Sequence, residues 1–140
     1  MIFLNKDRFL RLLIELFSKY ESMITLHSAV ISELLAVLKG AGVEGQFLSK
    51  LEEYLFNLNS YGDDAIKGKG APWSTSPEKL RSVRCVFPFT SSNVRILFVY
   101  QEGHLYLLAA FYERAGKKKT SYSAYTPIAR QRLEELLKER

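Results

Sequence analysis

The sequence predicts an α+β fold, in which amino-terminal helices pack on an antiparallel β-sheet meander and a carboxy-terminal helix follows. Apolar residues recur every three to four positions over 6–58, which is the period of a buried helix face. β-branched and aromatic residues at a period of about two then dominate 80–112, which is the pattern of strands. With 140 residues, of which 47% are hydrophobic, the chain suits a single domain over 1–140.

Three helices are expected in the first half of the chain. The apolar spacing predicts them over 6–20, 23–38 and 47–58. Gly40 and Gly42 should end the second helix, because glycine readily adopts the left-handed conformation past a helix terminus. These elements precede the part of the chain with strand character.

The second half begins with a predicted loop over 63–77, where glycines and prolines interrupt any apolar period. Trp73 is expected to pin this loop to the body of the protein. Three strands should follow, with a tight turn at Glu102-Gly103 between the last two. Their predicted ranges are Leu80–Phe89, Val94–Tyr100 and His104–Tyr112.

The terminal helix is expected to open at Thr126-Pro127, as an N-cap residue followed by proline at the first helical position. A polar link that contains Lys117, Lys118 and Lys119 should connect it to the last strand. The predicted order is therefore helices, strands and a final helix.

Positive charge is concentrated in the second half of the chain. Residues 1–66 carry six Lys/Arg and nine Asp/Glu, a net of −3, whereas residues 67–140 carry fourteen and six, a net of +8. This asymmetry favours an anionic partner, and nucleic acid is favoured over a membrane surface because no strongly basic amphipathic helix is present. We expect no contact with membranes.

The length of the apolar runs and the cysteine and histidine content predict the localisation and the cofactors. The longest apolar run, Leu105–Phe111, is far shorter than a membrane span, and the amino terminus lacks the order of a signal peptide, so a cytoplasmic protein is expected. The single cysteine, Cys85, can form neither an internal disulfide nor a CxxC zinc site. We expect no metal and no cofactor. His27 and His104 lie outside hydrolase motifs and are expected to be structural.

The candidate chemistry is cationic. If Arg81 and Arg95 lie on strands and Arg114 lies just beyond the third, the meander brings three guanidinium groups to surface positions of one sheet face. Arginines beside Tyr112, Tyr122 and Tyr125 would offer forked donors to phosphates and flat rings to unstacked bases, as single-stranded RNA recognition requires. The alternative is that these arginines form solvated surface pairs with nearby glutamates.

These residues also carry a family resemblance. The sequence over about 44–140 resembles the RelE/HigB superfamily of bacterial toxins, closest to the phage Gp49-like branch, and 1–43 would be a helical amino-terminal extension. The order and spacing of several stretches carry the resemblance, namely Glu78-Lys79-Leu80-Arg81-Ser82, Val94-Arg95-Ile96-Leu97-Phe98, Leu105-Tyr106-Leu107-Leu108, Phe111-Tyr112-Glu113-Arg114, Lys117 to Thr120 and Ile128-Ala129-Arg130-Gln131-Arg132-Leu133.

The resemblance implies a RelE-like fold and the toxin of a toxin–antitoxin system. Such a toxin is a ribosome-dependent, metal-independent mRNA endonuclease, or mRNA interferase, that uses no cofactor. Its partners would be the ribosome, mRNA and a cognate antitoxin of the DNA-binding helix-turn-helix kind. Carried over by position, the catalytic residues are Lys79, Arg81, Arg95, Arg114 and either Tyr122 or Tyr125, and the residues that contact RNA or the ribosome are Tyr112, Lys117, Lys118, Lys119 and Arg130.

The front of the chain departs from this pattern. The family's short amino-terminal strand would be at best Ile2-Phe3-Leu4, and the helical portion is longer by about one helix than the family's two-helix layer. Two other functions stay open. One is a ParE-like toxin that poisons DNA gyrase by association, and the other is a non-catalytic, phage-derived binding protein.

Overall fold

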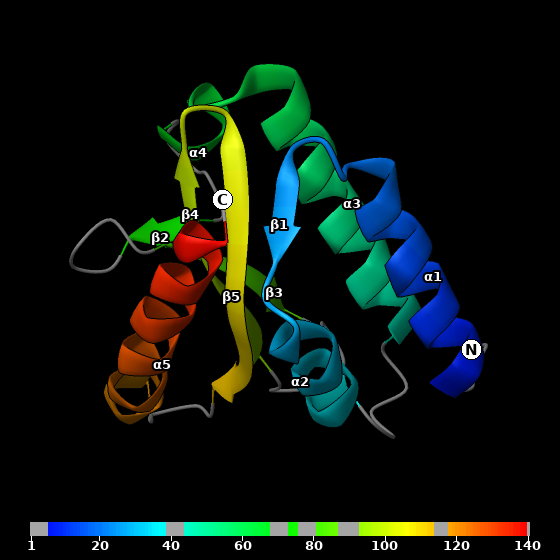
Figure 1. Cartoon of the computed structure of the whole chain (residues 1–140). Coiled ribbons are helices and arrows are strands. Elements are labelled where there is room, and N and C mark those ends of the chain that lie inside the picture. Colours follow the sequence, from blue (N-terminus) through cyan, green and yellow to red (C-terminus); the bar gives the residue numbers. More distant parts are fainter. Residues whose placement is uncertain are drawn as a thin grey trace.

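The described part of the chain forms one sheet with helices on both faces (Figure 1), which confirms the predicted α+β class. The helices are α1 (Lys6–Lys19), α2 (Ala29–Leu38), α3 (Glu44–Tyr61), α4 (Asp64–Lys67) and α5 (Lys118–Lys138), and the strands are β1 (Ile24–Leu26), β2 (Trp73–Thr75), β3 (Arg81–Val86), β4 (Asn93–Gln101) and β5 (His104–Glu113). The computed structural model describes residues 6–38, 44–67, 73–75, 81–86, 93–113 and 118–139, with side chains at 7–38, 44–66, 94–112 and 123–139.

The sheet has five described strands in the order β1-β5-β4-β3-β2. The pairs β2–β3, β3–β4 and β4–β5 are antiparallel, so the predicted meander of three strands is confirmed and a fourth strand extends it. The turn between β4 and β5 has φ of 52° at Glu102 and 75° at Gly103. Two successive positive φ values suit a two-residue hairpin, because their twist matches that of the strands. The predicted turn is therefore confirmed.

β1 corrects the prediction of a second helix that starts near Met23. Ile24–Leu26 is a strand that runs parallel to β5, and α2 begins only at Ala29. Two backbone bonds flank the short ladder, from Leu105 N–H to the Met23 carbonyl and from His27 N–H to the Leu107 carbonyl. The first described strand of the chain is therefore β1, which follows α1. Ile2-Phe3-Leu4, the segment named above as the candidate for the family's short amino-terminal strand, lies outside the described residues.

Two other segments differ from the prediction. The predicted loop over 63–77 contains the short helix α4 and the edge strand β2. The terminal helix begins at Lys118 rather than at Thr126, so Lys118 and Lys119 belong to a helix and Pro127 lies inside it. Proline removes one helical N–H donor. The turns on each side of Pro127 nevertheless form a continuous helix.

The two faces of the sheet hold separate apolar clusters. Side chains that alternate along β4 explain this division, because Val94, Ile96 and Phe98 pack with α1, α2 and α3, whereas Leu97 and Val99 pack under α5. A register irregularity between Leu97 and Phe98 interrupts the pairing with β5 without changing the division. The acidic half of the chain thus supplies most of one face, and α5 covers the other.

Candidate functional site

The predicted site residues gather mainly at one end of the sheet, where β4 begins and β5 ends. Arg95 is paired in register with Phe111, and Val94 is paired with Tyr112, whose side chain is half-buried. α5 begins beside the same end of the sheet, which lies at the bottom of Figure 1. Its first two residues are Lys118 and Lys119, and Tyr122 lies in its second turn.

Tyr125 connects α5 to this end of the sheet. Its ring stacks on that of Phe111, with centroids 4.6 Å apart and planes at 7°. Phe111 is itself the cross-strand neighbour of Arg95. Two residues predicted from remote parts of the sequence, Arg95 and Tyr125, therefore both adjoin Phe111.

Arg95 is not the surface residue that alternation along the strand predicted. Only 4% of it is exposed, and it lies on the sheet face that α5 covers. The prediction of a surface position is wrong because the helix starts eight residues earlier than expected and so extends over this end of the face. A buried guanidinium influences the site mainly through its field and its hydrogen bonds rather than by open contact with solvent.

The register also separates Arg81 from Arg95. Arg81 is paired with Phe98, which belongs to the cluster beneath α1, α2 and α3, whereas Arg95 is paired with Arg84. The expectation that Arg81 and Arg95 share one face is therefore wrong. Arg84 is the β3 arginine at the register position opposite Arg95. Successive positions of a strand alternate between the two faces of a sheet, so positions 81 and 84, which are three residues apart, lie on opposite faces. This spacing could have shown that Arg81 and Arg84 cannot both share the face of Arg95.

The carboxy-terminal half of α5 is joined to α2 by an ion pair and to His27, just before α2, by a hydrogen bond. Arg132 Nη1 lies 2.7 Å from Glu33 Oε1, and His27 Nε2 lies 2.7 Å from Glu135 Oε2. His27 Nδ1 also accepts a hydrogen bond from Ala29 N–H at the start of α2, so this histidine is structural. The second histidine, His104, is 2.6 Å from the Thr25 hydroxyl, which joins β5 to β1. The contacts of Arg132 and Glu135 fix the position of α5 relative to α2 and the sheet.

The other predicted residues are distributed less tightly. Arg130 is exposed on α5, five residues beyond Tyr125. Lys79, Arg114 and Lys117 lie outside the described residues.

Within the described residues, no group of three His, Cys, Asp or Glu side chains is arranged to hold a metal ion. No helix in this part of the chain is both long and apolar enough to cross a membrane. Comparisons with protein-family models, curated proteins and solved structures found no significant match to the chain.

Proposed function

We propose that the protein is the toxin of a toxin–antitoxin system and cleaves mRNA on the ribosome without a metal ion. The observation that carries this proposal is the convergence of Arg95 and Tyr125 with the lysine-rich start of α5 at one end of the sheet. Tyr112, the register partner of Val94, lies at the same end but on the opposite face. Cationic groups beside aromatic rings suit a phosphate backbone with unstacked bases. The amino terminus of α5 adds the positive end of a helix dipole to the same place.

The order of the elements also supports the proposal. β1, α2 and α3 correspond to the short strand and two-helix layer that the resemblance implies, and β3, β4, β5 and α5 follow as the meander and terminal helix. α1 is then the additional helix. On this reading the family-like part begins near Ile24, and the strand that the resemblance requires lies between α1 and α2.

The chemistry needs an in-line attack by a ribose 2′-hydroxyl on the adjacent phosphate. Charge on the pentavalent phosphate must be stabilised, one proton must leave the 2′-oxygen, and another must reach the 5′-oxygen. In our proposal Arg95 supplies a preorganised positive field from its buried position, and exposed cations such as Arg130 hold the strand. A tyrosine hydroxyl, of Tyr122 or Tyr125, donates a proton to the 5′-oxygen as the bond to phosphorus breaks, and the neutral amine of Lys79, which the resemblance assigns to catalysis, accepts the proton of the 2′-hydroxyl. The ribosome supplies most of the orientation.

Mapping the 5′ ends of mRNA on translating ribosomes tests the proposal. We expect discrete cuts after purified protein is added, cleavage that a metal chelator leaves unchanged, and little cleavage of the same RNA without ribosomes. Intact mRNA together with a DNA-damage response in cells would instead support a gyrase poison. Intact mRNA with no growth inhibition would support the non-catalytic binding protein.

A matched pair of variants on α5 tests the location of the site. Arg130 and Lys138 are both exposed cations of this helix, and they lie eight residues, or about 12 Å, apart along its axis. We expect Arg130→Ala to reduce cleavage and Lys138→Ala to leave it unchanged. Equal losses in both variants would mean that α5 contributes only general positive charge.

A further inference from the structure

Two arginines lie directly opposite one another on neighbouring strands of the sheet. The register of β3 and β4 pairs Arg84 with Arg95. Residues that are opposite in an antiparallel pair share one face of the sheet, with Cα atoms about 4.5–5.5 Å apart. Like charges at such positions repel each other and lower stability. An anion that binds beside both arginines relieves this repulsion, so the pair gains more from a bound anion than a single arginine does.

The neighbouring register positions leave this part of the face positive. On the same face, the positions next to the pair hold Ser82, Val86, Asn93, Leu97, Ala109, Phe111 and Glu113. Glu113 is the single acidic residue of this set, so the two arginines and the glutamate have a net charge of +1. Glu113 is diagonal to Arg95, and Cα atoms of diagonal neighbours are about 7–8 Å apart. One carboxylate at this distance does not neutralise both cations.

The position of α5 distinguishes the two arginines. The contacts of α5 with the sheet are concentrated on β5 and extend in part to β4, and Arg95 on β4 is only 4% exposed. Arg84 lies one strand further from β5, at the side of the area that α5 covers. A buried charge acts on its surroundings over a longer range than an exposed one, because the protein interior screens it less than water does. This placement therefore suits an anion at Arg84 that also experiences the field of Arg95.

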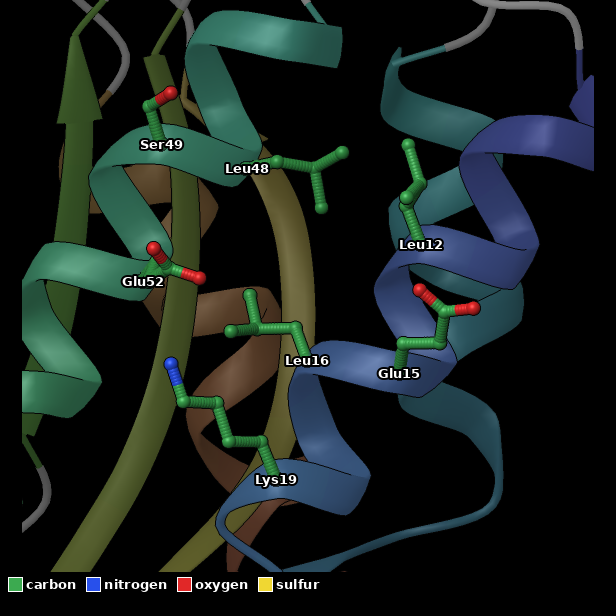
Figure 2. Close-up of a pocket in the computed structure, with 7 residues that line it drawn as sticks. All are labelled: Leu12, Glu15, Leu16, Lys19, Leu48, Ser49 and Glu52. Atoms are coloured by element: carbon green, nitrogen blue, oxygen red, sulfur yellow. The ribbon is translucent and has the colours of Figure 1, made fainter.

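A groove on the other side of the sheet lacks this positive character. It lies between α1 and α3, has a volume of about 380 Å³, and is shown in Figure 2. Its charged lining residues are Glu15, Lys19 and Glu52, a net of −1, and the remaining lining residues are three leucines and a serine. A lining with excess negative charge does not attract phosphate.

We propose that Arg84 binds a phosphate group of single-stranded RNA and that the buried Arg95 strengthens this binding. A guanidinium can donate two parallel hydrogen bonds to one phosphate, which makes arginine well suited to this ligand. The identity of the ligand as RNA rests on the proposed function, whereas the anion site itself rests on the register of β3 and β4. Arg81, to which the resemblance assigns a catalytic role, lies on the opposite face, so Arg84 is the arginine of β3 that belongs to the site.

Thermal unfolding in phosphate and in chloride of equal ionic strength tests the anion site without ribosomes. Phosphate stabilises proteins in general because it is excluded from their surfaces, so the readout is the difference between variants. We expect phosphate to raise the Tm of the wild type more than that of Arg84→Gln. Arg81→Gln changes the same strand on the opposite face and should respond to phosphate as the wild type does. An equal response in the wild type and Arg84→Gln overturns the proposal, and so does a response that is lost in Arg81→Gln instead.

The sign of the stability change in chloride separates this site from an internal ion pair. Removal of a repelled charge should leave the Tm of Arg84→Gln at or above that of the wild type. If Arg84 were held by Glu113 instead, Arg84→Gln and Glu113→Gln would both melt below the wild type, and this result overturns the proposal. Arg84→Lys keeps the charge without the planar fork of donors, so it should lose part of the phosphate response.

Fluorescence anisotropy with labelled oligouridylate tests whether the bound phosphate is that of RNA. We expect the Kd to rise by about 10–100-fold in Arg84→Gln, which is the range for a lost hydrogen bond between charged groups, and to rise much less in Arg81→Gln. Equal Kd values for these two variants overturn the inference, whether or not the protein cleaves mRNA. The expected order of Kd values without any cleavage on ribosomes would refute the proposed function and leave the phosphate site in place.

Discussion

Glu33 and Arg132 bind each other and the backbone of β5, at the part of its edge that β1 does not reach. Glu33 Oε1 accepts hydrogen bonds from Arg132 Nη1 at 2.7 Å and from the backbone N–H of Ala110 at 3.1 Å. Arg132 Nη1 also donates to the carbonyl of Leu108 at 2.9 Å. β1 is too short to pair with this part of β5, which ends the ladder before Leu108. The two side chains therefore satisfy exposed backbone groups and join α2 to α5 around the edge.

Removal of this carboxylate should destabilise the fold. We expect Glu33→Ala to lower the free energy of unfolding by about 1–3 kcal/mol, because the Ala110 N–H and the Arg132 guanidinium both lose their acceptor. Glu33→Gln retains an oxygen that can accept from Ala110 and should cost less. Urea unfolding measures both values.

A surface ion pair provides the control for this prediction. Lys50 Nζ and Glu53 Oε2 are 3.7 Å apart on the exposed side of α3. Glu53→Ala should change the free energy of unfolding by no more than about 1 kcal/mol, since exposed pairs contribute little. A similar loss in Glu33→Ala and Glu53→Ala would contradict the role assigned to Glu33.

Tyr100 should make stability depend on pH in the alkaline range. Burial, and secondly the negative charge of Asp63, raise the pKa of its phenol above the usual 10.0. Above pH 10.0 the unfolded chain releases this proton while the native chain retains it, so the free energy of unfolding falls as pH rises. The contribution is complete below pH 10.0 and is lost as pH rises through the native pKa.

Comparison with Tyr100→Phe isolates this effect from the other tyrosines. The variant has no proton to lose at this position, so its free energy of unfolding should fall less steeply above pH 10.0 than that of the wild type. Urea titrations on both sides of that pH provide the measurement. Parallel pH profiles for the two proteins would contradict the prediction.

Local patterns in the sequence predicted most elements but missed those that depend on remote partners. The period of two predicted β4 and β5 closely, and the two turn residues predicted the hairpin. Ile24–Leu26 also fits a helical spacing, and only its pairing with β5, about 80 residues later, makes it a strand. Secondary structure that rests on such pairing is not encoded locally.

The same limit applies to the candidate site. Pro127 is typical of the first turn of a helix, which placed the predicted start of α5 too late and left Arg95 uncovered. The stacking of Tyr125 on Phe111, a contact between residues 14 positions apart, helps to hold the preceding turns of α5 over the sheet. Residue types identified the basic and aromatic groups, but the burial of Arg95 depends on where that helix begins.

Arg95 should therefore contribute to stability as well as to activity. Truncation of a side chain that is 96% buried leaves a cavity and removes its packing contacts, so Arg95→Ala should lower the free energy of unfolding by about 2 kcal/mol or more. Arg130→Ala, at an exposed position, should change it by no more than about 0.5 kcal/mol. Urea unfolding of both variants checks this order. A stability loss in Arg130→Ala as large as that in Arg95→Ala would be inconsistent with their burial.

The choice between Tyr122 and Tyr125 can be made with two conservative variants. Tyr125→Phe keeps the ring that stacks on Phe111, so its stability should change by no more than about 0.5 kcal/mol. If the Tyr125 hydroxyl transfers a proton, the rate of cleavage on ribosomes should still fall by about 10²–10⁴-fold. Tyr122→Phe should then cleave at the wild-type rate.

Single-turnover cleavage on stalled ribosomes measures this rate without a contribution from product release. The converse result, a loss only in Tyr122→Phe, assigns the proton transfer to Tyr122 and leaves Tyr125 as a stacking residue. Wild-type rates in both variants would show that neither phenol transfers the proton. Tyr125→Ala separates the two roles of the ring, because it also removes the stack and should cost about 0.5–1.5 kcal/mol of stability beyond the buried area.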